Sequence, residues 1–454
     1  MWRRSNCAVA ICAALLAGLA ACTGSGSRGM TAVVPSSPPA MSTPSATATT
    51  TLAATSAATS AGTSTSAAMS PSSLTVVSGA RFCMLDNVPA GLAAVLARNV
   101  VHWPAGVLGF VGVLPDGTLV GNTKQSLELT TPGQATGRTI YRYTKASDFS
   151  FVQEVAETGG YLVFRVSYSD TSNADWAMVE VNIATGASHI IGRPEPGIGD
   201  DLMSIAPTAG DGYAAWSQAR ADNSLEVQIT DVATGVTRRV PWRNIAFPHI
   251  VDGVLLAVAH PSGHWQEPSG DYVVAFDLHT LAQVPLPAGL SGVSEPRNLE
   301  VTPAGVLWST TDFTTIHAIS ATNPNLLLTA NGSQAGPSNE DWPYLSDNGF
   351  ASWYQNGGGD GSGVFADLQT GVAVPLANQI YIAGNTVVAE TYHGNTVIDS
   401  VFSTANLPRL TGCTPTPTAA PLSATPAPPL TPLSVGSAGQ TPPFPRAGSS
   451  TPTT

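Results

Sequence analysis

Residues 159–166 read GGYLVFRV, a turn with two glycines followed by a run of apolar residues. The phrase returns as DGYAAWSQ from Asp211, DGVLLAVA from Asp252, AGVLWSTT from Ala304, NGFASWYQ from Asn348 and, more weakly, GNTVVAET from Gly384. The glycine before each run stands at positions 160, 212, 253, 305, 349 and 384, so the phrase recurs every 35 to 52 residues. A recurrence of this length predicts a repeated supersecondary unit.

A second phrase follows each glycine turn by about 20 to 25 residues. Its examples are VEVNIATGASHII, VQITDVATGVTRRV, VVAFDLHTLAQVPL and VFADLQTGVAVPL. The pairs Thr185-Gly186, Thr234-Gly235 and Thr370-Gly371 are typical of tight hairpin turns. The run Val227-Gln228-Ile229-Thr230 alternates with period two, as a half-buried strand requires. Helical periodicity is nearly absent, and we expect one short helix over 90–98.

Strand-rich units of about 40–50 residues, each with a hairpin, are typical of the blades of a β-propeller. We therefore predict an all-β fold, a propeller of seven blades over 75–413. Six units are clear, and a degenerate seventh comes first, at about 100–146 (it contains LPDGTLVGN and RTIYRYTKA). Six or eight blades remain alternatives, and an array of β-sandwiches is the alternative fold.

The repeated phrases resemble those of TolB-like and WD-repeat-like propellers of bacterial envelope proteins, over roughly residues 100–410. The stretch from Asp341-Trp342-Pro343 to Asp347-Asn348-Gly349 looks like the turn from an outer to an inner strand in that family. The chain departs from the family because it has no consistent Ser-Pro-Asp-Gly turn, and this leaves the subfamily open.

The N-terminus, MWRRSNCAVAICAALLAGLAAC, has a basic start, a short apolar run and small residues before Cys22. The run is too short to span a bilayer, so it reads as a secretory signal. Leu19-Ala20-Ala21-Cys22 resembles the lipobox of bacterial lipoproteins. The resemblance implies cleavage before Cys22 and a diacylglycerol, with fatty acids such as palmitate, on its thiol. An ordinary secretory signal or an uncleaved anchor are the alternatives.

Two segments are too polar and too rich in small residues to fold. Residues 31–74 contain 37 Ala, Ser, Thr or Pro among 44, and 414–454 contain 11 Pro and one charge. Such composition buries too little apolar surface to offset the entropy of ordering. We therefore divide the chain into a signal peptide (1–21), a lipidated and disordered tether (22–74), the propeller (75–413) and a disordered tail (414–454).

The predicted propeller is strongly acidic. It holds all 30 acidic residues and 14 of the 18 basic ones, a net charge of −16. A nucleic-acid binder needs a basic footprint, and anionic head groups repel an acidic surface. We therefore expect no nucleic-acid partner, a monomer, and attachment to the outer face of the bacterial cytoplasmic membrane through the lipid on Cys22.

No catalytic or metal-binding motif stands out. The predicted propeller has no G-x-S-x-G nucleophile elbow. His260 and His264 lie in a Pro/Gly-rich stretch with no third ligand nearby, so they do not predict a metal site. The stretch GGGDGSG at 357–363 joins two strands, so it does not predict a phosphate site. The acidic pairs Asp200-Asp201 and Glu340-Asp341 lack a calcium-loop spacing. We expect no cofactor and no metal.

Three tryptophans, Trp216, Trp308 and Trp353, occupy matching places in their repeats. We expect them to pack between blades, because each blade buries both faces against its neighbours. An aromatic platform for a sugar is the functional alternative.

Cys83 and Cys413 are the only cysteines of the predicted propeller and lie at its two ends. Closing a ring brings the chain ends together, and disulfides persist outside the cytoplasm. We therefore predict a disulfide between them, with Arg81–Leu85 as the strand that completes the last blade.

The sequence favours a membrane-anchored propeller that binds a protein or cell-wall partner without catalysis. The alternative is a glycan-cleaving or other hydrolytic enzyme with its site at the central mouth of the ring. An enzyme would bring carboxylates with raised pKa values together at that mouth.

The lipid anchor makes a direct prediction. Replacing Cys22 by Ala removes the thiol that carries the lipid, so the variant loses its label in cells fed a radioactive fatty acid. It also stays unprocessed or leaves the membrane fraction. Unchanged labelling of Cys22→Ala would contradict the anchor.

Overall fold

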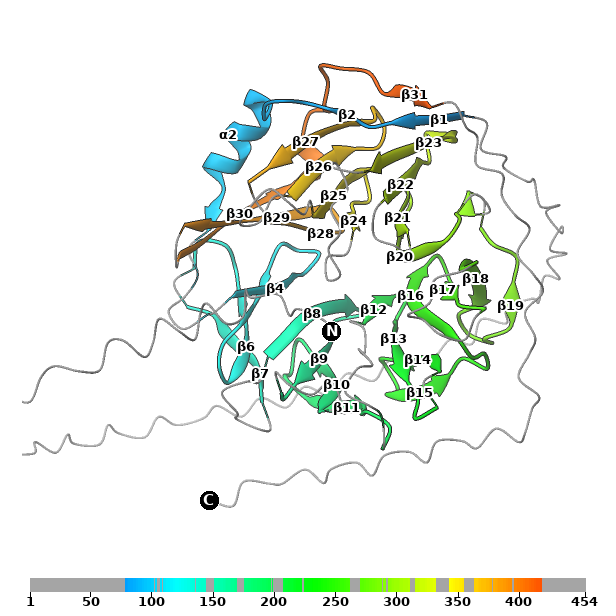
Figure 1. Ribbon diagram of the computed structural model, residues 1–454. Coiled ribbons are helices and arrows are strands. Elements are labelled where there is room, and N and C mark those ends of the chain that lie inside the picture. Colours follow the sequence, from blue (N-terminus) through cyan, green and yellow to red (C-terminus); the bar gives the residue numbers. More distant parts are fainter. Residues whose placement is uncertain are drawn as a thin grey trace, which may run out of the picture. The chain divides into compact units, whose positions relative to one another are not determined.

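The computed structural model describes residues 78–418, apart from short gaps. The gaps are 102, 104–106, 108, 135, 144–150, 170–174, 197, 199–206, 223, 262–269, 288, 291–292, 311–314, 332–342, 355–362, 378 and 394–395. The described strands form seven sheets around a ring, and the inner strands of the sheets are β4, β8, β12, β16, β20, β24 and β28 (Figure 1). The fold is a seven-bladed β-propeller, as the repeats predicted.

The first four blades each use four consecutive strands, and their bounds are as follows. Blade 1 has β4 (Gly109–Val113), β5 (Leu119–Asn122), β6 (Ser126–Thr130) and β7 (Arg138–Arg142). Blade 2 has β8 (Phe151–Thr158), β9 (Tyr161–Ser167), β10 (Trp176–Asn182) and β11 (Ser188–Gly192). Blade 3 has β12 (Thr208–Gly210), β13 (Tyr213–Ala219), β14 (Leu225–Asp231) and β15 (Val236–Arg239). Blade 4 has β16 (Ile245–Val251), β17 (Val254–Ala259), β18 (Tyr272–Asp277) and β19 (Gln283–Val284).

The last three blades also take strands from the N-terminal side of the propeller. Blade 5 has β20 (Pro296–Thr302), β21 (Gly305–Thr310), β22 (Thr315–Ser320) and β23 (Asn323–Asn331), with β1 (Ser78–Arg81) and β31 (Thr416–Thr418) added outside. Blade 6 has β24 (Tyr344–Leu345), β25 (Phe350–Tyr354), β26 (Gly363–Asp367) and β27 (Val372–Leu376), with β2 (Cys83–Met84) outside. Blade 7 has β28 (Gln379–Ala383), β29 (Thr386–His393), β30 (Thr396–Ser403) and β3 (Val100–Val101).

The repeated glycines mark the turn between the first and second strands of each blade. Asp211 and Gly212 both have positive φ, 52° and 79°, and so do Asp252 and Gly253, 49° and 75°. Two consecutive residues of positive φ form the turn that matches the twist of a two-residue hairpin, and glycine adopts this φ without steric cost. Asp347-Asn348-Gly349 is the turn from inner β24 to β25, with a positive φ of 89° at Gly349. This part of the stretch is therefore not an outer-to-inner connection, and Asp341-Trp342 lies outside the described residues.

The second phrase is stabilised by a side chain that the sequence analysis did not single out. An Asn or Asp ends the third strand and accepts hydrogen bonds from backbone N–H groups two or three residues later. Asn182 accepts from Ala184 and Thr185, and Asp231 from Ala233 and Thr234, at 2.9–3.1 Å. Asp277 and Asp367 do the same in blades 4 and 6. This Asx turn positions the hairpin to the outer strand.

The core lies between neighbouring blades. Trp216 of blade 3 packs in one cluster with Met178 of blade 2, and Trp308 of blade 5 with Leu256 of blade 4. Trp353 shares a cluster with Ala318 of blade 5. The three indoles are at most 3% exposed. Packing between blades is therefore confirmed for these tryptophans, and none forms an open sugar platform.

A two-residue strand closes the ring. Val100 pairs with Ser400 and Val101 with Asp399, so β3 is the outer strand of the last blade, antiparallel to β30. The prediction that Arg81–Leu85 completes this blade was wrong. That stretch contributes β1, parallel to β23 of blade 5, and β2, parallel to β27 of blade 6. The predicted helix α2 (Ala90–Arg98) is present and carries the chain on to β3.

The two ends of the ring domain are fastened together on the outside of blades 5 and 6. Cys83 and Cys413 form the predicted disulfide, with Cα atoms 6.0 Å apart across 330 positions of sequence. The fully buried Asp367 carboxylate accepts from Arg409 Nη1 and from the Leu410 backbone N–H, both at 3.1 Å. The Arg409 guanidinium lies 4.9 Å from the centre of the Phe350 ring. Beyond it, β31 pairs antiparallel with β1.

Among the residues that the structure describes, no helix has both the length and the apolar character needed to cross a membrane.

The disulfide should contribute much of the stability of the closed ring. A crosslink over 330 positions stabilises by up to about 5–6 kcal/mol in the chain-entropy model. We expect the double variant Cys83→Ser/Cys413→Ser to unfold at a lower denaturant concentration than the native chain. Reductant should lower the unfolding midpoint of the native chain in the same way. Reductant should leave the double variant unchanged, and an equal midpoint for native and variant chains would contradict a stabilising role.

Candidate functional site at the mouth of the ring

The two faces of the ring differ because the strands of a blade alternate in direction. Turns between first and second strands, and between third and fourth strands, lie on one face, which we call the turn face. Connections between second and third strands, and from each blade to the next, lie on the other, the loop face. Turns on the turn face are as short as Gly159-Gly160, whereas 12 residues separate β17 from β18 and 15 separate β11 from β12 in the sequence. Binding residues concentrate on long connections held by a rigid scaffold.

A buried histidine and a buried aspartate lie at the base of one loop-face connection. His260 follows β17 and is 2% exposed, and Asp271 precedes β18 and is 4% exposed. The His260 Nδ1 atom lies 3.0 Å from Asp271 Oδ2. His260 Nε2 and both Asp271 oxygens nevertheless have no hydrogen-bond partner of acceptable geometry. Buried polar atoms are nearly always hydrogen-bonded, so these atoms indicate a site that a ligand or water completes.

A buried arginine lies next to this pair. Arg297 is the second residue of inner strand β20, and its guanidinium lies 5.0 Å from the centre of the Phe247 ring of inner strand β16. Burial lowers the pKa of Arg297 to about 10, and the nearby Asp271 carboxylate opposes that shift. The Phe247 ring also meets the His260 ring edge-on, at 6.0 Å between centroids. The four side chains, His260, Asp271, Arg297 and Phe247, form what we call the mouth cluster.

The backbone around the mouth cluster is strained. Asn244, Phe247 and Glu295 have φ values of 57°, 52° and 46°, which non-glycine residues rarely adopt. The Asn244 carbonyl accepts from the His260 N–H at 2.8 Å, and the Asp271 carbonyl accepts from the Glu295 N–H at 3.2 Å. Strain of this kind persists where surrounding structure holds it, and it gathers at ligand sites.

Both inner strands that contribute to the cluster are also bulged. The register shifts between Ala246 and His249 in β16, and between Pro296 and Leu299 in β20. The bulge in β16 is held from the neighbouring blade, because the Phe247 N–H donates to Ser217 Oγ at 2.9 Å. Bulges re-aim side chains at the rim of a sheet, and here they bring Phe247 and Arg297 together.

The carboxyl groups with raised pKa values lie elsewhere. Burial, with a smaller contribution from Asp231, raises the pKa of Glu180 in β10 to about 7. Burial raises the pKa of Asp399 in β30 to about 6, partly offset by a hydrogen bond from the Trp103 indole. These residues belong to blades 2 and 7, so they do not converge, and no pair of raised carboxyl groups meets at the mouth among the described residues.

Several residues singled out by the sequence analysis lie outside the described residues. They are Leu19, Ala20, Ala21, Cys22, His264, Asp200-Asp201, Glu340-Asp341 and 357–362 of the glycine-rich stretch. In the part of the chain that the structure describes, no group of three or more His, Cys, Asp or Glu is arranged to hold a metal ion. The sequence analysis missed Asp271, Arg297 and Phe247, since only tertiary packing joins them.

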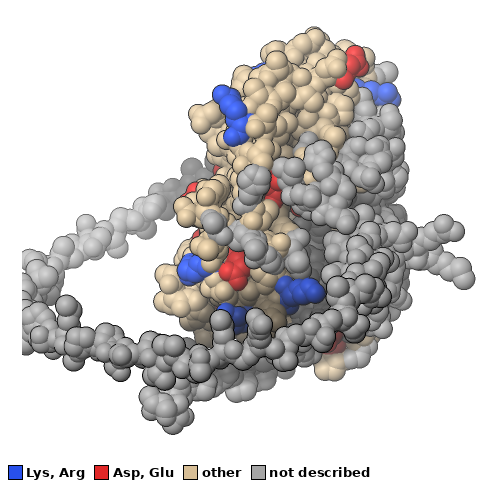
Figure 2. Space-filling model, turned by 90° about the vertical axis from the view of Figure 1, so that its left-hand side faces the viewer, with Lys and Arg blue, Asp and Glu red and all other residues tan. Residues whose placement is uncertain are grey.

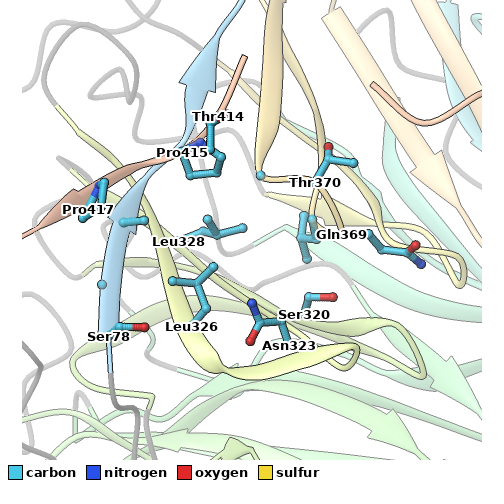
Figure 3. Close-up of a pocket in the computed structure, with 14 residues that line it drawn as sticks. Ser78, Ser320, Asn323, Leu326, Leu328, Gln369, Thr370, Thr414, Pro415 and Pro417 are labelled. Carbon is cyan, nitrogen blue, oxygen red and sulfur yellow. The ribbon is translucent and has the colours of Figure 1, made fainter. Parts of the chain in front are cut away.

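A pocket of about 330 Å³ lies at the outer edge of blades 5 and 6, away from the mouth cluster. Figure 3 shows Leu326 and Leu328 of β23 beside Pro415 and Pro417 of the C-terminal segment. Turn-face residues Ser320 and Thr370 also line the pocket, together with Ser78 at the start of β1. The first residues of β1 and the last of the C-terminal segment therefore lie beside turns of the turn face.

The visible surface carries few charges. On the side shown in Figure 2, the charged side chains of the described residues stand singly or in small groups amid uncharged surface. No continuous basic patch is seen there, in agreement with the acidic net charge of the chain, −12.

The ring of seven four-stranded units, closed by β3, defines the class of the protein as a seven-bladed β-propeller. No family model and no curated protein sequence matches the chain. Among solved structures it is similar to the hydrazine synthase of Kuenenia stuttgartiensis (13% identity, TM-score 0.43, covering 70% of this chain and 99% of that chain). It is also similar to an oligogalacturonate lyase of Vibrio parahaemolyticus (10% identity, TM-score 0.40, 56% and 76%). A third is the β-propeller domain of the Trilobed protease of Pyrococcus furiosus (10% identity, TM-score 0.36, 56% and 82%).

At these identities and TM-scores the likenesses carry no argument about activity. The fold rests on the strand pairing, and the function must be argued from the residues of the chain itself.

The buried Asp399 carboxyl makes stability depend on pH. Its pKa rises from 3.8 to about 6 on folding, so the folded state loses stability as pH rises through 6, and below about pH 4 this penalty disappears. We expect Asp399→Asn to stabilise the chain by up to about 3 kcal/mol at pH 8 and by much less at pH 4. Urea unfolding at both pH values measures this, with Asp86→Asn at an exposed site as control. Equal effects at the two pH values would contradict the prediction.

Proposed function

We propose that the protein is a lipoprotein of the bacterial envelope, anchored by a diacylglycerol on Cys22, whose propeller binds a protein or cell-wall partner without catalysis. The binding surface is the loop face around the mouth cluster. The observation that carries the proposal is a strained, buried cluster with unpaired polar atoms at the base of the long connections. Sites for other molecules gather convergent polar groups in this way.

The path of the chain agrees with this assignment. Ser78, where β1 begins, lies in the pocket beside turn-face residues, and so does Pro417 of β31. The point where a tether joins the propeller, at Ser78, is therefore beside the turn face. A flexible segment of about 50 residues spans about 40 Å root mean square, which is long enough to lift the propeller clear of the lipid.

A hydrolytic enzyme is the second candidate, and one observation favours it. A histidine with one ring nitrogen beside a carboxylate and the other unpaired is the arrangement of an oriented general base. The carboxyl groups with raised pKa values argue against an enzyme, because Glu180 and Asp399 lie on separate blades. We therefore place binding first.

Site-specific photocrosslinking in intact cells tests the proposal. A photoreactive amino acid at exposed Pro261, next to His260 on the loop face, should give discrete crosslinked species. The same amino acid at exposed Thr185, in a turn-face hairpin, is the matched control and should give far fewer. Equal yields from both positions would contradict binding through the loop face. Release of soluble sugars from purified cell wall by the native chain, abolished in His260→Ala, would establish the enzyme instead.

A further inference from the structure

We propose that the mouth cluster binds hydroxyl groups of a neutral glycan, with Asp271 as the principal hydrogen-bond acceptor and His260 beside it. This inference rests on the proposed function and narrows it, because it names a cell-wall polysaccharide, and not a protein, as the partner of the loop face.

The first argument comes from hydrogen-bond valence. A carboxylate only accepts hydrogen bonds. Asp271 is buried, and neither of its oxygens receives a hydrogen bond of acceptable geometry, although His260 Nδ1 lies 3.0 Å from Oδ2. The group that completes the site must therefore bring donors. A hydroxyl group donates one hydrogen bond and accepts others, so one hydroxyl can donate to Asp271 while it accepts from a protonated Nε2 of His260. Where Nε2 is unprotonated, a second hydroxyl of the same sugar can donate to it.

The second argument comes from charge. The Arg297 guanidinium already interacts with the Asp271 carboxylate, so the cluster does not require a second cation, and Arg297 opposes an ammonium group. An anionic ligand is opposed by Asp271 and by exposed Glu295 at the start of β20. A neutral ligand with several donors avoids both penalties, and this combination describes a sugar without carboxyl or amino groups.

The third argument concerns access. His260 and Asp271 are buried, but their chain neighbours Pro261 and Gly270 are both exposed. The two buried side chains therefore adjoin exposed backbone at both ends of the connection from β17 to β18.

The test measures binding of wall polysaccharide from the producing cells to the full-length acylated chain in detergent micelles. The polysaccharide is separated by ion exchange into neutral, acidic and basic fractions, and binding is followed by calorimetry. We expect binding to the neutral fraction. Asp271→Asn replaces an acceptor oxygen with a donor nitrogen and should weaken that binding roughly 10- to 100-fold, the loss expected for a hydrogen bond to a charged group.

The matched control is Glu180→Gln. It makes the same acid-to-amide change at a buried carboxyl that also has an unpaired oxygen, in β10 of blade 2. This variant should bind the neutral fraction like the native chain. If Asp271→Asn lowers the melting temperature, His260→Gln provides a second variant, and it should weaken binding in the same direction.

Three outcomes would overturn the inference. They are no binding of the neutral fraction, stronger binding of a charged fraction, and native affinity in Asp271→Asn, which would mean that buried water alone completes the cluster. Crosslinks from position 261 to a protein, without glycan binding, would defeat this inference and leave loop-face binding intact. The absence of both would defeat the proposed function as well.

Discussion

The propeller depends on the pairing of β3 with β30. Seven sheets arranged in a ring bury their faces only if the last sheet packs against the first, and blade 7 obtains just three strands from the C-terminal part of the chain. Val100 and Val101 supply the fourth. A two-residue strand is weak alone, and the surrounding structure compensates. The chain before β3 adds strands β1 and β2 to the outer edges of blades 5 and 6. The disulfide and the Arg409–Asp367 ion pair then hold the C-terminal segment against these blades.

This closure separates the two faces of the ring. Both ends of the described chain are tied to the outer edge of blades 5 and 6, beside turns. The loop face is left with the long connections, the bulged inner strands and the mouth cluster. Tight turns stabilised by Asx side chains such as Asp231 contribute rigidity on one face, and strain at Phe247 gathers on the other.

The sequence predicted those features that depend on local pattern. Recurring glycines predicted six blades, because each blade needs a tight turn at the same place, and a degenerate unit predicted the seventh. Matching tryptophans predicted the packing between blades. The closing strand was misassigned because Val100-Val101 is too short to show a strand pattern, whereas the longer apolar stretch Arg81–Leu85 does form strands but pairs with other blades. The disulfide followed from topology alone, since a closed ring brings its ends together. The mouth cluster could not be predicted, because Asp271 and Arg297 come together only through bulges in the strands, and no local sequence pattern predicts these bulges.

Mapping of the disulfide in protein purified from cell membranes without reductant tests the account most directly. Thiols are blocked on lysis, the chain is digested, and the peptides are analysed by mass spectrometry before and after reduction. Ring closure with fastened ends predicts a single crosslinked pair joining Cys83 to Cys413, with neither thiol blocked. Two blocked thiols, or either cysteine joined to another chain, would contradict the closed and fastened ring.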